Sequence, residues 1–231
     1  MAKRKKSKAS QKNSLTPWII GAAVLFIVLI VVTVFLSGRS PSVSIEPPDV
    51  SDGYVNGTEL GDPNAPVVVQ AWEDFLCPAC GQWASTIEPR LVEDYVESGD
   101  VKLEFHQFPL QIHAPGAQLG AQASECAADQ NMFWPYHDRL FVEAASRGQA
   151  GFQLERLIGY AEELGLDEST FRQCMISQTH RSTVDASVNE AVTMGLNSTP
   201  SVLINGQIVQ PFDYDAIKAI IDAELAANSG E

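Results

Sequence analysis

Two cysteines three positions apart are the residues of this sequence best suited to chemistry. Cys77 and Cys80 enclose a Pro-Ala dipeptide within the stretch WEDFLCPACGQW, residues 72–83. Such a pair can exchange a disulfide with other thiols, supply half of a zinc site, or form a structural disulfide. A C-x-x-C motif alone does not decide among the three, so the rest of the chain must be considered.

A zinc site would need two further ligands, and the sequence offers none at a suitable spacing. There is no second C-x-x-C, and the four histidines show no paired ligand spacing: His106, His113, His137 and His180. His137, in the stretch WPYHD, is expected to pack in a helix rather than bind a metal or act as a base. The chain has no G-x-S-x-G motif, which argues against a serine hydrolase. We therefore expect neither a metal nor a cofactor.

Thiol–disulfide exchange suits the pair if a helix begins there. At a helix N-terminus, free backbone N–H groups and the helix dipole stabilise a thiolate, which predicts a lowered pKa for Cys77. A stable thiolate favours the reduced form and makes the Cys77–Cys80 disulfide a stronger oxidant. Cys80, one turn deeper, would be the resolving thiol. Pro78 suits the first helical turn, where its missing N–H costs nothing. Pro78 and Ala79 would tune the pair, but they leave the direction of the reaction open.

The elements around the pair are typical of a mixed α/β domain. Residues 66–72 form a β-branched run that predicts a buried strand, and the alternation over residues 101–108 predicts a second strand. Between them we expect a helix from the cysteine pair to about residue 98, ended by Gly99 and kinked by Pro89. This order indicates a parallel strand–helix–strand unit.

The second half of the chain is predicted to contain helices followed by a hairpin. Residues 117–194 have helical apolar spacing with short Gly and Asp breaks. Residues 201–209 predict a β-hairpin, because Asn205-Gly206 suits a turn with positive φ at both positions. Residues 216–227 predict a last amphipathic helix. The whole order is compatible with a thioredoxin-like sheet interrupted by a helical subdomain.

Five stretches make the chain resemble the DsbA-like branch of the thioredoxin superfamily. They are GDPNAPV at 61–67, FLCPAC at 75–80, FPL at 108–110, ASECAADQNMFWPYHDRLF at 123–141 and TPSVLING at 199–206. The likeness runs from about residue 58 to residue 225. It implies an α/β, thioredoxin-like fold at residues 58–228, with a helical insertion at about 113–194.

The resemblance implies a protein thiol–disulfide oxidoreductase with Cys77 and Cys80 as its catalytic pair. Thr199–Pro200 would be a cis peptide bond opposite the pair, where it would bind clients and keep metal away from the thiols. From the Thr-Pro dipeptide alone a trans bond would be favoured, because cis is only about 5–6% of X-Pro bonds. Ser198 stands where relatives commonly have glycine, a difference that bears on client preference.

One departure from the family pattern concerns the proton of Cys80. Many thioredoxin-like proteins have a buried acid six residues before the first cysteine, a candidate proton relay, and here that position is Ala71. Glu73, Asp74 and Glu104 are candidate substitutes. Strand alternation allows only some of them to face the site.

The remaining cysteines, Cys126 and Cys174, lie 48 residues apart in the predicted helical region. Outside the cytoplasm paired cysteines usually oxidise, and a disulfide here would clamp the insertion. The alternative is two separate buried thiols, since free cysteine packs as a small hydrophobic residue. We expect the disulfide, although no spacing rule requires it.

The N-terminal region has the composition of a membrane anchor. Residues 1–16 are basic and contain no acid, and residues 17–37 form an apolar run. At 1.5 Å per residue this run matches a hydrocarbon core of about 30 Å and exceeds the apolar core of a cleaved secretory signal. The positive-inside rule would keep residues 1–16 in the cytoplasm. Residues 38–57, rich in proline, serine and acids, are expected to form a flexible linker.

The charge balance differs between the two sides of the expected anchor. Residues 1–40 hold seven of the fifteen basic residues and none of the 29 acids, so residues 41–231 have a net charge of −21. Binding to phosphates needs a basic face, so this charge argues against nucleic acid as a partner.

These inferences combine into a membrane-anchored oxidoreductase of DsbA-like type, in contact with lipid through residues 17–37, whose domain lies outside the cytoplasmic membrane. Its Cys77–Cys80 disulfide would pass to cysteines of exported proteins. A quinone-linked membrane protein resembling DsbB or a vitamin K epoxide reductase homologue would reoxidise it. The alternatives are a reductase or isomerase, for example in cytochrome c maturation, and a non-catalytic peptide-binding module.

One apolar set at helical spacing is expected to form core, with a client-binding groove as the alternative: Phe133, Trp134, Tyr136, Leu140 and Phe141.

Overall fold

The computed structural model describes residues 25–27 and 53–228. Residues 25–27 are helical, and no helix in these two ranges is long and apolar enough to cross a membrane. The predicted basic tail lies outside the described residues, and so does the predicted anchor at 17–37 apart from those three positions.

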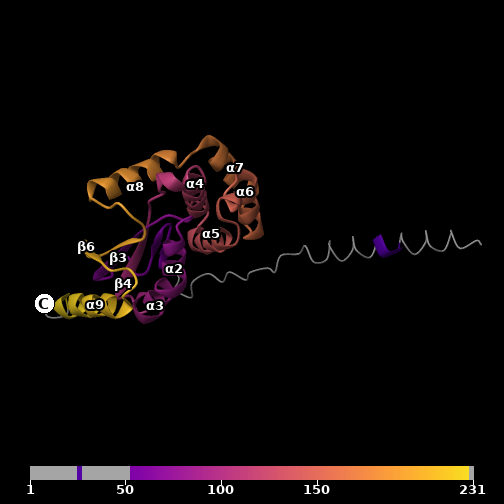
Figure 1. Ribbon diagram of the computed structural model, residues 1–231. Helices are drawn as coiled ribbons and strands as arrows, with labels where there is room; N and C mark the ends of the chain where they lie inside the picture. The colour runs from indigo at the N-terminus through magenta and orange to yellow at the C-terminus, as the bar shows by residue number, and fades with distance from the viewer. Residues whose placement is uncertain (1–24, 28–52, 229–231) are drawn as a thin grey trace, which may run out of the picture. The chain divides into compact units, whose positions relative to one another are not determined.

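A mixed sheet of six strands in the order β1-β2-β4-β3-β5-β6 runs through the domain (Figure 1). Strands β3 (Val67–Glu73) and β4 (Val101–Gln107) pair in parallel along their whole length. On the other side of β3, β5 (Ser201–Ile204) pairs antiparallel and continues as a hairpin into β6 (Gln207–Val209). The predicted parallel unit and hairpin are therefore confirmed, and the hairpin turn has positive φ at both residues.

The folded domain begins earlier than the sequence predicts. Strands β1 (Val55–Asn56) and β2 (Glu59–Leu60) form a small antiparallel hairpin, and β2 pairs with β4 at the edge of the sheet. Residues 53–57 thus belong to the domain rather than to the predicted linker at 38–57. Strands of two residues have no readable alternation, which is why the sequence pattern does not reveal them.

The helix after the cysteine pair is interrupted near Pro89. It consists of α2 (Pro78–Thr86), α3 (Glu88–Leu91) and a π-helical turn at Val92–Val96. Proline has no N–H to donate to the preceding turn and its ring crowds that turn, so the single predicted helix divides here. The segment ends before Gly99, whose φ of +82° suits glycine.

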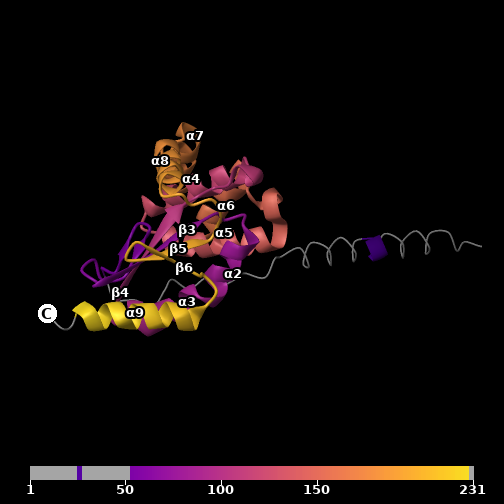
Figure 2. The same cartoon turned by 60° about the vertical axis from the view of Figure 1, so that its left-hand side comes forward.

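The predicted helical insertion lies between β4 and β5. Its five α-helices are α4 (Gly116–Ala128), α5 (Phe133–Arg147), α6 (Leu154–Glu163), α7 (Glu168–Ser177) and α8 (Arg181–Thr193). In both views α7 and α8 lie at the end of the domain away from the last helix, α9 (Tyr214–Asn228) (Figures 1 and 2). The start of α9 is capped by Asp213, which accepts a hydrogen bond of 3.0 Å from the backbone N–H of Ala216.

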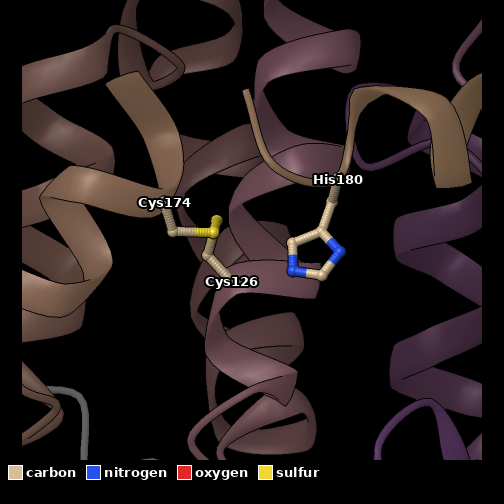
Figure 3. Close-up of side chains that lie close together, drawn as sticks. All are labelled: Cys126, Cys174 and His180. Carbon is tan, nitrogen blue, oxygen red and sulfur yellow. A yellow bond between two sulfur atoms is a disulfide. The ribbon is translucent and has the colours of Figure 1, made fainter. Parts of the chain in front are cut away.

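A disulfide joins two helices of the insertion. Cys126 in α4 and Cys174 in α7 are bonded, as expected, with Cα atoms 6.0 Å apart (Figure 3). His180 lies beside the disulfide, and its Nε2 is 2.7 Å from the carboxylate of Asp129. Disulfide sulfurs are not thiolates, so this group of side chains does not supply the ligand set of a zinc site.

Replacing both Cys126 and Cys174 with alanine is expected to lower the free energy of unfolding by about 2–4 kcal/mol, because the open chain gains conformational freedom. Urea unfolding would measure the loss. The background should be Cys77→Ser/Cys80→Ser, in which the remaining disulfide is the only one a reductant can break. In that background a reductant should destabilise the parent and leave the alanine variant unchanged. Equal stability of the parent with and without reductant would contradict the prediction.

Candidate active site

Cys77 and Cys80 occupy different environments although α2 carries both. Cys77 is the N-cap of α2 with an extended backbone, and Pro78 follows in the first turn as predicted. Cys77 is partly exposed, whereas Cys80 is fully buried. Both are free thiols in this structure, which therefore shows the reduced pair.

The surroundings of Cys77 stabilise its thiolate. The pKa of Cys77 is lowered to about 5, mainly by hydrogen bonding with the Cys80 thiol. Partial burial opposes this shift, while hydrogen bonding with Thr199 and with the backbone N–H groups of Cys80 and Ala79 supports it. The direction agrees with the expectation for a cysteine at a helix N-terminus.

The surroundings of Cys80 keep its proton in place. Burial raises the pKa of the Cys80 thiol, and the hydrogen bond with Cys77 and the charge of Glu73 raise it further. The backbone N–H of Asp74 donates to the Cys80 sulfur over 3.4 Å, which opposes the rise only in part. The two thiols thus differ strongly in acidity, and Cys77 is the one suited to act as a nucleophile.

A loop from far along the chain completes the surroundings of Cys77. Thr199–Pro200 is a cis peptide bond, as the resemblance implies, and the carbonyl oxygen of Thr199 lies 3.4 Å from the Cys77 sulfur. The pairing of β5 with β3 brings this loop to the start of α2. A second cis bond, Ala114–Pro115, precedes α4 and was not predicted, because an X-Pro dipeptide alone does not reveal its isomer.

Asp74 holds the loops near the site together. Its buried carboxylate accepts hydrogen bonds from the backbone N–H groups of Leu76 at 2.8 Å and Leu110 at 2.9 Å. It is also 2.7 Å from Nδ1 of His113. Asp74 thereby connects the turn before α2 to the segment after β4. The contacts of its carboxylate are with these loops and not with the Cys80 sulfur, so they do not support it as a substitute for the missing acid at position 71.

Glu104 is not supported as the substitute either, because it belongs to a separate polar network. Its carboxylate contacts Lys102 at 2.7 Å, His106 at 3.3 Å and Gln70 at 3.0 Å. Hydrogen bonding with His106 is the main cause that lowers its pKa to about 2. Gln70 lies opposite Glu104 in the sheet and, by strand alternation, on the face away from Ala71.

Glu73 is the remaining candidate, and it faces the cysteines. Strand alternation puts it on the same face of β3 as Ala71, two residues further along the strand. The side chain is buried, and hydrogen bonding with the Cys80 thiol favours its charged form. Burial, followed by the charge of Cys77, raises the pKa of Glu73 well above its usual value.

An apolar groove of about 690 Å³ opens beside Cys77 between α2 and α5. Its lining includes Leu76, Phe141 and Val142. The apolar set at helical spacing, Phe133, Trp134, Tyr136, Leu140 and Phe141, is buried as expected. Phe141 belongs both to the core and to the wall of the groove. A reduced thiol of low pKa next to an apolar groove can exchange disulfides with a peptide that binds there.

Comparisons with known proteins agree with this geometry. A family model described as thioredoxin matches residues 55–223. A probable disulfide bond formation protein D of Bacillus anthracis is 32% identical over 176 residues, which cover 74% of this chain and 80% of that protein. The disulfide bond formation protein D of Bacillus subtilis is 31% identical, over 72% of this chain and 76% of that protein. Oxidised BdbD from Bacillus subtilis has a similar structure, with a TM-score of 0.68 and 28% identity over 74% of this chain and 94% of that one.

The thiolate absorbance of the reduced protein is expected to titrate at a pH of about 5, the pKa of Cys77. Cys80→Ala should raise this pKa, because it removes the main stabilising hydrogen bond. Cys77→Ser should abolish the transition. A single transition near the value of an ordinary cysteine, about 8.5, would contradict the prediction.

The same shift predicts how the stability of the reduced protein depends on pH. The folded pKa of Cys77 is lowered below the unfolded value of about 8.5, so its contribution is complete above that pH and is lost as the pH falls through about 5. Urea unfolding of the reduced protein at several pH values would measure this, with reduced Cys77→Ser as the reference. Parallel pH profiles for the two proteins would contradict the prediction.

Proposed function

This chain belongs to the DsbA-like branch of the thioredoxin superfamily and is a thiol–disulfide oxidoreductase, and from that premise we propose that it donates its Cys77–Cys80 disulfide to exported proteins. The observation that carries the proposal is the asymmetry of the pair. Cys77 is accessible and has a lowered pKa, whereas Cys80 is buried and has a raised one. A reduced form stabilised in this way corresponds to an oxidising disulfide.

The reaction proceeds in two exchanges at Cys77. A client thiolate attacks the Cys77 sulfur of the oxidised pair, so that a client–Cys77 disulfide forms and the Cys77–Cys80 bond breaks. Cys80 leaves as a thiolate and takes up a proton. A second client thiolate then attacks the client sulfur of this mixed disulfide and releases the Cys77 thiolate. The client loses two electrons and the enzyme gains them, and the low pKa of Cys77 makes it a good leaving group.

The groove beside Cys77 is the proposed client site. Its apolar lining would bind hydrophobic side chains of an incompletely folded client. The carbonyl oxygen of Thr199, 3.4 Å from the Cys77 sulfur, would accept a backbone hydrogen bond from the client. Ser198, next to Thr199, would influence which clients bind.

We further propose that residues 17–37 anchor the domain outside the cytoplasmic membrane, with residues 1–16 inside. The apolar length of this segment and the basic residues before it support the proposal. In that position a quinone-linked membrane protein resembling DsbB or a vitamin K epoxide reductase homologue would reoxidise Cys77 and Cys80.

The reduction potential of the full-length protein, equilibrated against glutathione, tests the direction of transfer. A disulfide donor should have a potential near the value of DsbA, about −120 mV. A value near that of thioredoxin, about −270 mV, would assign the protein as a reductase instead. Cys126→Ala/Cys174→Ala is the matched control and should leave the potential unchanged, because the second disulfide lies within the insertion.

Cys80→Ser is expected to accumulate a mixed disulfide with a cysteine-containing peptide, because Cys77 remains reactive and cannot be resolved from within the protein. Cys77→Ser should form none. Mass spectrometry after acid quenching would detect the adduct and locate it. Adducts in equal yield on both variants would contradict the assignment of Cys77, and adducts on neither would favour a non-catalytic peptide-binding module.

A further inference from the structure

The proposed reaction requires a proton to move at a place that solvent does not reach. Cys80 gains a proton each time the disulfide is donated and loses one each time the pair is reoxidised. Its side chain is fully buried, and its sulfur interacts with Cys77, the backbone N–H of Asp74 and the Glu73 carboxyl. An N–H group cannot accept the proton. A nearby group with a suitable protonation range must therefore exchange it.

Three ionisable side chains from different elements meet in the core, and one of them, Glu73, acts on Cys80. Glu73 ends β3, Glu88 begins α3 and His137 lies in α5, and one possible ligand atom of each lies within 4.8 Å of the others. All three are buried. Apart from the interaction with Cys80, neither oxygen of Glu73 has a hydrogen-bond partner in the described part of the chain, and Nε2 of His137 also has none there.

Aromatic rings enclose this cluster and limit the net charge it can hold. The ring of His137 packs edge-on against Phe75, Phe105 and Phe141, with centroids 4.8–5.7 Å apart. Because a buried net charge is costly, the two carboxyls and the imidazole are expected to share protons so that their charges cancel. An imidazolium, one carboxylate and one protonated carboxyl satisfy this condition.

The directions of the pKa shifts agree with proton sharing near neutral pH. Burial is the main cause that raises the pKa of Glu73 well above normal and that of Glu88 to about 8. Burial lowers the pKa of His137, but the charges of Glu88 and Asp138 outweigh burial and raise it overall.

The cluster has a connection to the surface. Glu88 and Asp138 both line a cavity of about 260 Å³, and Asp138 also lines the groove at Cys77. The Glu88 side chain is 9% exposed, in contrast to the fully buried side chain of His137. Nδ1 of His137 lies 2.8 Å from the carboxylate of Asp138, which is 43% exposed. Glu88 and Asp138 are thus the members through which a proton can reach water.

We propose that Glu73 exchanges the proton of Cys80, and that Glu88 and His137 pass it to and from the cavity lined by Glu88 and Asp138. The inference rests on the proposed reaction at Cys77 and Cys80. When Cys80 leaves as a thiolate, protonated Glu73 donates to it. When the pair is reoxidised, the Glu73 carboxylate takes the proton as the Cys80 sulfur bonds to Cys77. One proton crosses the cluster in each half-reaction, in opposite directions.

Cys77 takes no part in this proton route. The ionisable groups that face Glu73 are Cys77 and Cys80 from α2, Glu88 from α3, and His137 followed by Asp138 from α5. Asp74 is adjacent in sequence, but its carboxylate is engaged with Leu76, Leu110 and His113.

The test is the pH dependence of the step in which Cys80 attacks a mixed disulfide. The full-length reduced protein is first reacted with oxidised glutathione to load Cys77, and the release of glutathione is followed in a single turnover. The wild-type rate should rise with pH and level off once the cluster has lost its proton. Glu73→Gln should be slower by about tenfold or more at neutral pH and should not level off, because only solvent hydroxide remains as a base.

Two further variants make the result specific. In Glu88→Gln the rate should become constant at a lower pH than in wild type, because the substitution removes a like charge that raises the pKa of Glu73. Glu104→Gln is the matched control: it removes a carboxylate from the same sheet and breaks the pair with Lys102, and its profile should match wild type. A chelator should not alter the wild-type profile. If it does, the three side chains hold a metal and the relay is wrong.

The outcomes separate the relay from the function on which it rests. If wild type does not form a glutathione adduct at Cys77, the proposed function fails. If the adduct forms, the relay alone fails under either of two results. The rate of glutathione release by Glu73→Gln has the same pH dependence as wild type, or it is reduced by the same factor at every pH.

A measurement on wild-type protein decides the matter if Glu73→Gln does not fold. The infrared difference spectrum between the oxidised and reduced forms, with glutamate carboxyls isotopically labelled, should contain a shifted band of a protonated glutamic acid. The absence of any glutamic acid band in that difference spectrum would overturn the proposal.

Discussion

The chemistry of this domain depends on holding two sulfur atoms of one helical turn in opposite environments. Cys77 caps α2 where backbone N–H groups point outward, and Cys80 lies in the core against β3. The parallel pairing of β3 with β4 establishes this arrangement, because it ends β3 directly before the turn that leads into α2. The Thr199 loop, 122 residues further on, reaches Cys77 only because β5 pairs with the opposite side of β3. One strand thus positions both sulfurs and the loop that faces them.

Features that depend on local backbone chemistry could be predicted from the sequence. The cysteine spacing, the Asn205-Gly206 turn and the interruption at Pro89 each follow from the residues at those positions. The hairpin of β1 and β2 could not be predicted, because its strands are too short for alternation to be visible. The isomer of Ala114–Pro115 could not be predicted either, since it depends on tertiary surroundings.

The buried cluster of Glu73, Glu88 and His137 could be predicted from the sequence only in part. Strand alternation alone indicates that Glu73 shares a face of β3 with Ala71, so this member of the cluster could be predicted. Asp74 next to it has an equally acidic side chain but forms hydrogen bonds with two loops. Glu88 and His137 carry no sign of their role, because an acid in a first helical turn is common and a lone histidine usually packs in a core. Only the packing of α3 and α5 against the end of β3 brings them to Glu73.

The disulfide between α4 and α7 makes the folding of each new chain depend on an oxidant. A newly made chain carries four thiols, and two of them, Cys126 and Cys174, must be oxidised before the insertion is clamped. Protein disulfides form by exchange with an existing disulfide, so the new chain is itself a client for an oxidised donor. Under the proposed function, an older copy of this protein would serve as that donor. Maturation would then be self-propagating in the population, and recovery from complete reduction would begin slowly and accelerate as finished copies accumulate.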